Sequence, residues 1–382
     1  MDKYDIIVIG AGLTGCALAV ELAQQNARVL LLEKTYNPVN ATVLSYGGIA
    51  YWCGTDELTI KLCEEAIEIY RNLHEQLDED VEFRDITLLF TIDKNQDVER
   101  TFEEYKQFYI KPEFLDVAET ISLEPLINPE AIAGSLKFPQ GHVNPSKLLS
   151  AYRRKLEKLG GKIIIDEGLS LRRNKGKIEG VSGKNNSYLA EKVVVCAGAF
   201  SRRIFQENGV DLPLYFSQAQ VVKTHPSDIK LSTLVMPATT NRLDTEKKVA
   251  REAIWESQSD TIYGDVLEAG AIQFKDGSCC LGQISQIIPN LNPKIDAKTS
   301  EKRLREAIGK ILPPLAQLPG NWYNCQVAFS KEAPFLVKEI PEREGLSVFS
   351  GFTSPFVFAP PLARHFAHYL VTGEDEIIGL LA

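Results

Sequence analysis

Residues 4–15 read YDIIVIGAGLTG, and this stretch gives the strongest indication of a fold class. Its first half, Tyr4 to Ile9, is a compact β-branched run that is too short for a helix and suits a strand buried on both faces of a parallel sheet. Apolar residues then recur at helical spacing from Ala17 to about Gln25. The sequence therefore predicts a strand, a glycine-rich turn and a helix in direct succession.

Each glycine of the turn has its own mechanical task. Gly10 lets the chain turn tightly, Gly12 lets the backbone approach a pyrophosphate, and Gly15 lets the helix and strand pack closely. Leu13 and Thr14 stand at the start of the helix, where unpaired N–H groups and the positive end of the dipole favour anions. We therefore expect these five residues to bind the phosphates of a dinucleotide.

A second predicted strand, Arg28 to Leu32, ends at Glu33. A carboxylate about 20 residues beyond the glycines is placed to accept hydrogen bonds from a ribose, and it argues against a 2′-phosphate. Lys34 follows as a further candidate for the cofactor site. Because strand, glycines, helix, second strand and acid occur in order, the pattern favours a Rossmann-type unit over an ordinary glycine-bearing turn.

Size and composition limit the classes of function. A chain of 382 residues can form two sizeable cores, and a net charge of -9 without long basic runs disfavours binding to nucleic acid or anionic membranes. No stretch is apolar enough to span a bilayer, and the first residues lack a signal-peptide pattern. The seven cysteines are odd in number and lack C-x-x-C spacing, so neither a disulfide framework nor a metal site is predicted. We expect a cytoplasmic protein.

Four later segments extend the opening pattern. They are Ser45–Ala50 (SYGGIA), Gly141–Pro145 (GHVNP), Lys192–Ala199 (KVVVCAGA) and Val348–Ser354 (VFSGFTS). With these motifs in this order, nearly the whole chain resembles the D-amino acid oxidase, glycine oxidase and sarcosine oxidase family of flavoproteins. The resemblance implies that the dinucleotide is FAD.

The resemblance also assigns further residues to the FAD site. They are Ser45, Gly47, Gly48, Ile49, Leu169, Ala197, Gly198, Gly351, Phe352, Thr353 and Ser354. After the last of these, Pro360 and Pro361 open a helical pattern from Leu362 to Val371. In the family this helix directs its N-terminus at the N1 and C2 carbonyl region of the flavin, where its dipole would stabilise negative charge.

The implied fold class is α/β, with a Rossmann-type FAD-binding domain and a second, mixed-sheet α+β substrate domain. The FAD domain would be discontinuous, comprising residues 1–80, 140–210 and 328–382. Residues 81–139 and 211–327 would form the substrate domain. Short β-like runs there, such as Ile86 to Ile92 and Ser278 to Ile284, predict an antiparallel or mixed sheet.

The implied reaction is dehydrogenation of a C–N bond of an amino acid or amine, by hydride transfer to flavin N5. An amino-acid substrate needs a cation for its carboxylate, most efficiently an arginine. Related enzymes supply that arginine at positions that match Gln326 and Val327 here. Replacement donors could come from Arg242, Arg251, Tyr263 or Tyr323, and the loop-like setting of Arg242 suits a ligand-binding role.

Cys325 raises the question of a covalent flavin, because sarcosine-oxidase-like relatives attach their flavin to a cysteine in a similar place. The neighbouring residues match poorly, so we expect non-covalent FAD. The position of the oxygen-activating lysine of those relatives holds Cys280 or its neighbour, which leaves oxidase and dehydrogenase both open. 

Two alternative functions also fit the missing arginine. One is a 2-hydroxy acid dehydrogenase on the same scaffold, and the other is a flavin-binding subunit without turnover. In either enzymatic reading the partner is a small-molecule substrate. The sequence leaves the substrate, the electron acceptor and the oligomeric state open.

Overall fold

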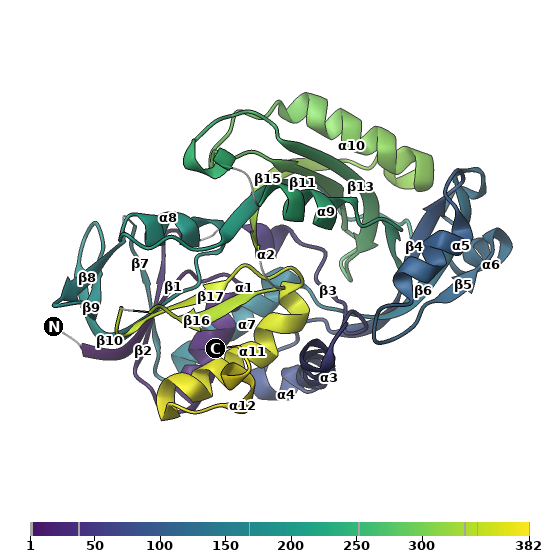
Figure 1. Cartoon of the computed structure of the whole chain (residues 1–382). Helices are drawn as coiled ribbons and strands as arrows, with labels where there is room; N and C mark the ends of the chain where they lie inside the picture. The colour runs from purple at the N-terminus through teal and green to yellow at the C-terminus, as the bar shows by residue number, and fades with distance from the viewer. Residues whose placement is uncertain are drawn as a thin grey trace.

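The structure is a computed structural model that describes residues 3–36, 39–167, 169–250, 253–331, 334–341 and 343–381. Within these ranges the chain forms two sheets, one at the lower left and one at the upper right of Figure 1. Helices cover each sheet, and segments far apart in the sequence meet in both.

The first sheet has eight strands, and its parallel part runs in the order β17-β10-β1-β2-β7. The bounds of these strands are β1 (Lys3–Ile9), β2 (Val29–Glu33), β7 (Lys162–Ile165), β10 (Ser187–Val195) and β17 (Leu346–Ser350). Three antiparallel strands complete it, namely β16 (Leu336–Glu339) beside β17 and the hairpin of β8 (Ser170–Asn174) and β9 (Lys177–Ser182) beside β10. The parallel sheet predicted from the opening stretch is confirmed.

β1 is buried on both faces because its side chains alternate between two hydrophobic cores. Ile6 and Val8 belong to one core, and Ile7 and Ile9 belong to the other. The first core is built with the helices α1 (Leu13–Gln24), α3 (Glu57–Arg71), α7 (Pro145–Lys158) and α11 (Pro355–Thr372). The β8–β9 hairpin and α8 (Ser201–Gln206) contribute to the second core.

The second sheet has nine strands in the order β15-β11-β14-β13-β12-β4-β6-β3, with β5 beside β6. Their bounds are β3 (Gly48–Ile49), β4 (Arg84–Asp93), β5 (Glu113–Leu115), β6 (Ile132–His142), β11 (Leu214–Thr224), β12 (Leu234–Pro237), β13 (Gly264–Gln273), β14 (Cys279–Ile287) and β15 (Gly320–Ser330). β12 and β4 pair in parallel and the other pairs are antiparallel, so the predicted mixed sheet is confirmed. Helix α10 (Ala297–Ile311) covers one face through Leu304 and Ile308 (Figure 1).

The remaining helices are short connections. They are α2 (Ala41–Leu44), α4 (Leu73–Leu77), α5 (Val98–Tyr105), α6 (Val117–Leu123), α9 (Asn241–Val249), α12 (Glu376–Gly379) and the 3-10 turns η1 (Pro129–Ala131), η2 (Gly198–Phe200), η3 (Ala253–Glu256) and η4 (Pro313–Leu315). Over the described ranges, none of the helices combines the length and apolar character that crossing a membrane requires.

The C-terminal helix corrects one expectation. α11 begins at Pro355 rather than after Pro361, so Pro360 and Pro361 lie inside the helix. Proline lacks an N–H but fits a helical φ, so these two residues omit hydrogen bonds of the early turns without ending the helix. Pro355 at the first helical position is the proline that marks the start, and the helix ends as expected at Gly373 with φ +88°.

The strands of the first sheet come from three separated parts of the chain, within residues 3–33, 162–195 and 336–350. All of these lie inside the segments 1–80, 140–210 and 328–382 expected for the FAD domain. One strand of those segments, β3, pairs instead with β6 of the second sheet. The proposed domain division stays a prediction.

Candidate functional site

The glycine turn between β1 and α1 is crowded on its inner side. Gly10 has φ +103°, and a Cβ there would lie 2.7 Å from the carbonyl oxygen of Cys196. A Cβ on Gly15 would lie 1.8 Å from the carbonyl oxygen of Gly10. Neither position accepts a side chain without a shift of backbone, because a Cβ on Gly10 would overlap the chain just after β10 and a Cβ on Gly15 would overlap the turn after β1.

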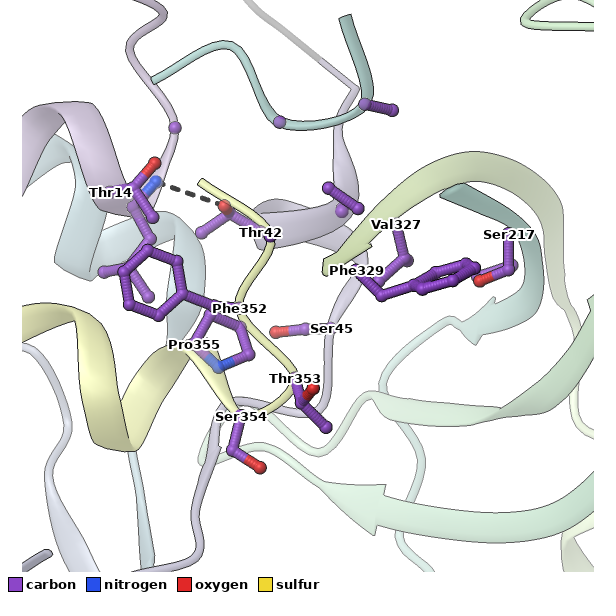
Figure 2. A pocket seen from close by; sticks show the side chains of 18 of the residues that line it. Thr14, Thr42, Ser45, Ser217, Val327, Phe329, Phe352, Thr353, Ser354 and Pro355 are labelled. Carbon is purple, nitrogen blue, oxygen red and sulfur yellow. Dashed lines mark hydrogen bonds between the residues drawn. The ribbon is translucent and has the colours of Figure 1, made fainter. Parts of the chain in front are cut away.

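The outer side of the same turn is open. A Cβ on Gly12 would meet no atom closer than 3.5 Å, the distance to Thr42 Oγ1. Gly12 is the N-cap of α1 and offers no side-chain cap, so the first-turn N–H groups depend on other acceptors. One of them, the N–H of Leu13, donates to Thr42 Oγ1 at 3.2 Å (Figure 2). The open turn leaves space for a phosphate at a helix N-terminus.

The carboxylate of Glu33 lies beside this turn at the end of β2. Its Oε2 accepts a hydrogen bond from the N–H of Ala11 at 2.8 Å, and its Oε1 accepts one from the N–H of Lys34 at 2.9 Å. Each oxygen keeps a further lone pair, which is what a ribose hydroxyl would need. β10 ends at the same edge before Ala197, as does β17 before Gly351, as expected for the ligand-binding edge of a parallel sheet.

A cavity of about 1260 Å³ runs from the glycine turn to the second sheet. Figure 2 shows part of it, with Thr14 and Thr42 near the turn and Val327 and Ser217 on strands of the second sheet. Pockets for one small ligand commonly have about 300–1,000 Å³. The cavity is therefore large enough for a dinucleotide together with a small substrate.

Most residues predicted for FAD line this cavity. They are Gly10, Gly12, Leu13, Thr14, Glu33, Lys34, Ser45, Gly47, Gly48, Leu169, Ala197, Gly198, Gly351, Phe352, Thr353 and Ser354. Two predicted residues do not line it. Gly15 lies beneath the turn, and Ile49 is fully buried in β3, opposite Gly141 of β6. Their expected contact with the cofactor stays a prediction.

The substrate-binding candidates divide between the cavity and other places. Arg242 lines the cavity. Tyr263 does not, and its side chain is 40% exposed. Tyr323 lies in β15 and packs against a hydrophobic core outside the lining, while Arg251 lies outside the described residues.

The setting of Arg242 differs from the loop-like one expected from its sequence. Arg242 is in the first turn of α9, which begins after Thr240. Its Nη1 donates to both carboxylate oxygens of Glu246, at 3.2 and 3.3 Å, and its Nε lies 3.4 Å from Oε2 of Glu268. Two carboxylates thus surround Arg242, which among the described residues is the candidate arginine that lines the cavity.

Sequence reasoning missed Glu246 and Glu268, which both line the cavity and are 4% and 6% exposed. The four-residue spacing of Arg242 and Glu246 is a recognisable helical ion-pair pattern and could have indicated the first pair. Glu268 belongs to a separate strand, β13, and no local pattern connects it to α9.

Cys325 lines the cavity as a thiol. It is 4% exposed, and its Sγ donates to the carbonyl oxygen of Ala219 at 3.7 Å. Burial raises the pKa of the Cys325 thiol to about 12, so it stays protonated at neutral pH. Nucleophilic attack by sulfur requires the thiolate, which this setting disfavours.

Within the described part of the chain, no group of His, Cys, Asp and Glu could hold a metal ion.

Comparison with known proteins identifies the class to which this fold and cavity belong. The model of the DAO family, described as FAD dependent oxidoreductase, matches residues 5–369. The chain therefore belongs to the DAO family of FAD-dependent oxidoreductases, and the family inferred from its motifs is confirmed.

Individual relatives are distant. Human peroxisomal sarcosine oxidase is 26% identical over 216 residues, which cover 56% of this chain and 55% of that protein. Glycine oxidase of Geobacillus kaustophilus is 25% identical over 245 residues, which cover 61% of this chain and 64% of that protein. The matched region thus spans between about half and two thirds of these relatives.

Solved structures agree over a larger share of the chain. The crystal structure of the glycine oxidase from Geobacillus kaustophilus has a TM-score of 0.81 at 18% identity and covers 98% of this chain and 96% of its own. That of L-proline dehydrogenase from P. horikoshii has a TM-score of 0.79 at 19% identity, with coverages of 98% and 95%. At these identities the likeness concerns the fold, which confirms the predicted fold class.

Proposed function

We propose that the chain holds FAD non-covalently in the cavity and dehydrogenates a C–N bond of an amino acid or amine. The observation that carries the proposal is the continuity of the cavity. One open space joins the glycine turn and Glu33 of the first sheet to a polar cluster around Arg242 on the second sheet. A dinucleotide bound at the turn and a substrate bound at the second sheet would therefore share one compartment.

The residues at the turn suit the diphosphate and ribose of FAD. Gly12 and Thr14 offer an open helix N-terminus, and Glu33 offers an acceptor that already belongs to the turn. Leu169 lines the cavity beyond β7, where an adenine would need only an apolar neighbour. Bound FAD would supply the hydride acceptor, a capacity that protein side chains lack.

The residues between the two sheets suit the ring system. The loop from Ser45 to Gly48 and the loop from Gly351 to Ser354 both line the cavity. Ser354 is the N-cap of α11 and makes no side-chain capping hydrogen bond, and Pro355 has no N–H. The N–H of Val357 donates to the carbonyl oxygen of Ser354, so among the described residues the N–H of Phe356 is the first-turn donor left for a ligand. Such an end stabilises negative charge that develops during a reduction.

One part of the cavity wall, beside β4 of the second sheet, is aromatic. Trp52, Phe90, Tyr105 and Phe108 line it, and the rings of Trp52 and Phe108 are 5.0 Å apart between centroids. This aromatic wall would exclude water from the reacting carbon. The buried thiol of Cys325 supports non-covalent binding, because burial raises its pKa and a protonated thiol is a poor nucleophile.

The proposal includes two further expectations, one on the cellular compartment and one on the division into domains. All seven cysteines are free, which suits a reducing compartment such as the cytoplasm. We also propose that the segments 1–80, 140–210 and 328–382 act as the FAD domain and that 81–139 and 211–327 carry the substrate site. Cell fractionation would test the first of these, and limited proteolysis with and without FAD would test the second.

Flavin spectroscopy tests the function directly. The purified chain should be yellow, and its flavin absorption should bleach without oxygen when an amino acid or amine from a panel is added. Protein that is colourless and cannot be reconstituted with FAD would exclude the cofactor. Bleaching by 2-hydroxy acids alone would exclude C–N chemistry, and a flavin that no compound in the panel bleaches would indicate binding without turnover.

A further inference from the structure

We propose that the substrate carries a net positive charge, as a diamine does, and that Glu246 and Glu268 bind its cationic group. The inference rests on the proposed function, because it specifies the substrate class of the same cavity. It starts from the polar cluster of Arg242, Glu246 and Glu268, which faces the cavity from helix α9 and strand β13.

The net charge of the cluster does not favour the binding of an anion. Arg242 contributes one positive charge, and the two carboxylates within hydrogen-bonding or ion-pair distance contribute up to two negative charges. Burial raises the pKa of Glu246, although Arg242 opposes the shift. With both carboxylates ionised the cluster is negative, and with one ionised it is neutral. In neither state does Arg242 have unbalanced charge for a substrate carboxylate.

One carboxylate oxygen of Glu268 is available to accept a hydrogen bond. Its Oε2 accepts from Nε2 of Gln283 at 3.3 Å and lies 3.4 Å from Nε of Arg242. Among the described residues, no donor reaches its Oε1. Leaving one oxygen of a carboxylate that is 6% exposed without a donor is costly in free energy, and an N–H of a bound cation would supply that donor.

Ser285 is an independent sign of a missing ligand. Its side chain lines the cavity from β14 and is 3% exposed, yet its Oγ has no hydrogen-bond partner among the described residues. Buried hydroxyl groups are nearly always paired in folded proteins. A hydroxyl can accept a hydrogen bond from an ammonium or guanidinium group, as the neighbouring carboxylates can.

The local backbone places these groups together. The register of β13 against β14 shifts between Leu267 and Gly270, so Glu268 lies within a bulge. A bulge re-aims side chains relative to the regular alternation of a strand, and bulges are frequent beside active sites. Arg242 and Glu246 reach the same place from one face of α9, four residues apart.

A purely structural ion network is the competing explanation. It would account for one arginine paired with one glutamate. It leaves the second negative charge unbalanced, and among the described residues it leaves Oε1 of Glu268 and the hydroxyl of Ser285 without a hydrogen-bond partner. Lys247 is the other cation that lines the cavity from α9, and no ion pair joins it to Glu246 or Glu268 among the described residues.

A matched pair of probes separates the two explanations by charge alone. N-butylguanidinium and N-butylurea have nearly the same shape, and neither carries an oxidisable amine. Calorimetric titration of the FAD-loaded protein should give a dissociation constant about tenfold or more lower for the guanidinium, because a partly buried carboxylate attracts a cation strongly. Equal affinities for the two probes would overturn the inference.

Variants show whether the cluster is responsible. In Glu268→Gln the preference for the guanidinium should fall to about twofold or less, since one carboxylate charge is lost. Glu306→Gln, on the exposed face of α10, is the matched control and should keep the full preference. An unchanged preference in Glu268→Gln would overturn the assignment. If Glu268→Gln does not fold, the same measurement on Glu246→Gln still tests the cluster. The affinities of the wild type for the two probes still test the preference for a cation.

The substrate class has its own readout. Anaerobic bleaching by 1,4-diaminobutane should be faster than bleaching by norvaline, which has a carboxylate and no second cation. Bleaching by norvaline alone would leave the proposed C–N chemistry intact and overturn the cationic substrate. Loss of FAD binding or of all bleaching would instead overturn the proposed function itself, so the two failures are distinguishable.

Discussion

The carboxylate of Glu33 accepts a hydrogen bond from the backbone N–H of Ala11 at 2.8 Å. The acid at the end of β2 is thereby attached to the glycine turn that follows β1. If a ribose also binds to this carboxylate, the turn and the sugar are held by the same side chain.

Glu33→Gln should weaken FAD binding. The change removes a charged acceptor and turns an amide N–H₂ towards backbone donors, and hydrogen bonds to charged groups are worth about 1.5–3 kcal/mol. We expect the dissociation constant for FAD to rise by about ten- to a hundredfold in fluorescence titrations of the apoprotein. Glu191→Gln, which removes an exposed ion pair with Lys3, is the control and should bind FAD as the wild type does. Wild-type affinity in Glu33→Gln would remove Glu33 from the site.

The variants Gly12→Ala and Gly15→Ala should distinguish an effect on FAD binding from an effect on stability. Gly12→Ala has room in the protein itself, because the nearest atom is 3.5 Å from the added Cβ, but a bound diphosphate would be displaced. Its free energy of unfolding should stay within about 1 kcal/mol of the wild type in the absence of FAD, while FAD affinity falls at least about tenfold. Unchanged FAD affinity would show that no phosphate approaches Gly12.

Gly15→Ala, in contrast to Gly12→Ala, should lower the stability of the FAD-free protein. The added Cβ would lie 1.8 Å from the Gly10 carbonyl oxygen, so α1 must move away from β1. We expect a loss of about 1–3 kcal/mol of stability, typical of overpacking, in urea unfolding of the FAD-free protein. A stable Gly15→Ala apoprotein would contradict the close packing of strand and helix.

The flavin should be released by denaturation. The Cys325 thiol is protonated and donates to Ala219, so no thioether to the flavin is expected. Acid precipitation of the holoprotein should leave all FAD in the supernatant, as measured by its absorption. Cys325→Ala should retain FAD when native. Flavin that stays with the wild-type precipitate and not with that of Cys325→Ala would establish a covalent bond.

His365 should make stability depend on pH. Burial lowers its pKa, but hydrogen bonds to Glu65 and Asp375, each at 3.0 Å, outweigh burial and raise the pKa above the ordinary value of 6.5. The charged ring therefore stabilises the fold below the unfolded pKa, and this contribution is lost as the pH rises through the folded pKa. His365→Gln should be destabilised more at about pH 6 than at about pH 9 in urea unfolding.

His368→Gln is the control for this prediction, because His368 is exposed on the same helix and no ion pair involves its side chain among the described residues. Its stability relative to the wild type should not change with pH. An equal loss in His365→Gln at both pH values would show that the hydrogen bonds of the ring matter and its charge does not.

The predictive power of the sequence varied between parts of the site. The glycine turn and Glu33 were predictable because each answers a local requirement, namely a positive φ, close backbone contact or the end of a buried strand. The start of α11 was placed late because two internal prolines resemble a helix start. The substrate end was the least predictable, since Arg242 was identified and the carboxylates that surround it were not.

The parallel βαβ unit, the family and the residues at the carboxyl ends of the strands could be inferred from the order of amino acids alone. Each motif involves neighbours within about 30 residues, for which periodicity and glycine positions carry the information, and the order of the motifs along the chain indicates the family. Only the tertiary structure decided what Arg242 binds, because Glu268 comes from a strand that meets α9 through folding and not through sequence proximity. Charge neutralisation depends on distances in space, and a linear pattern does not contain those distances.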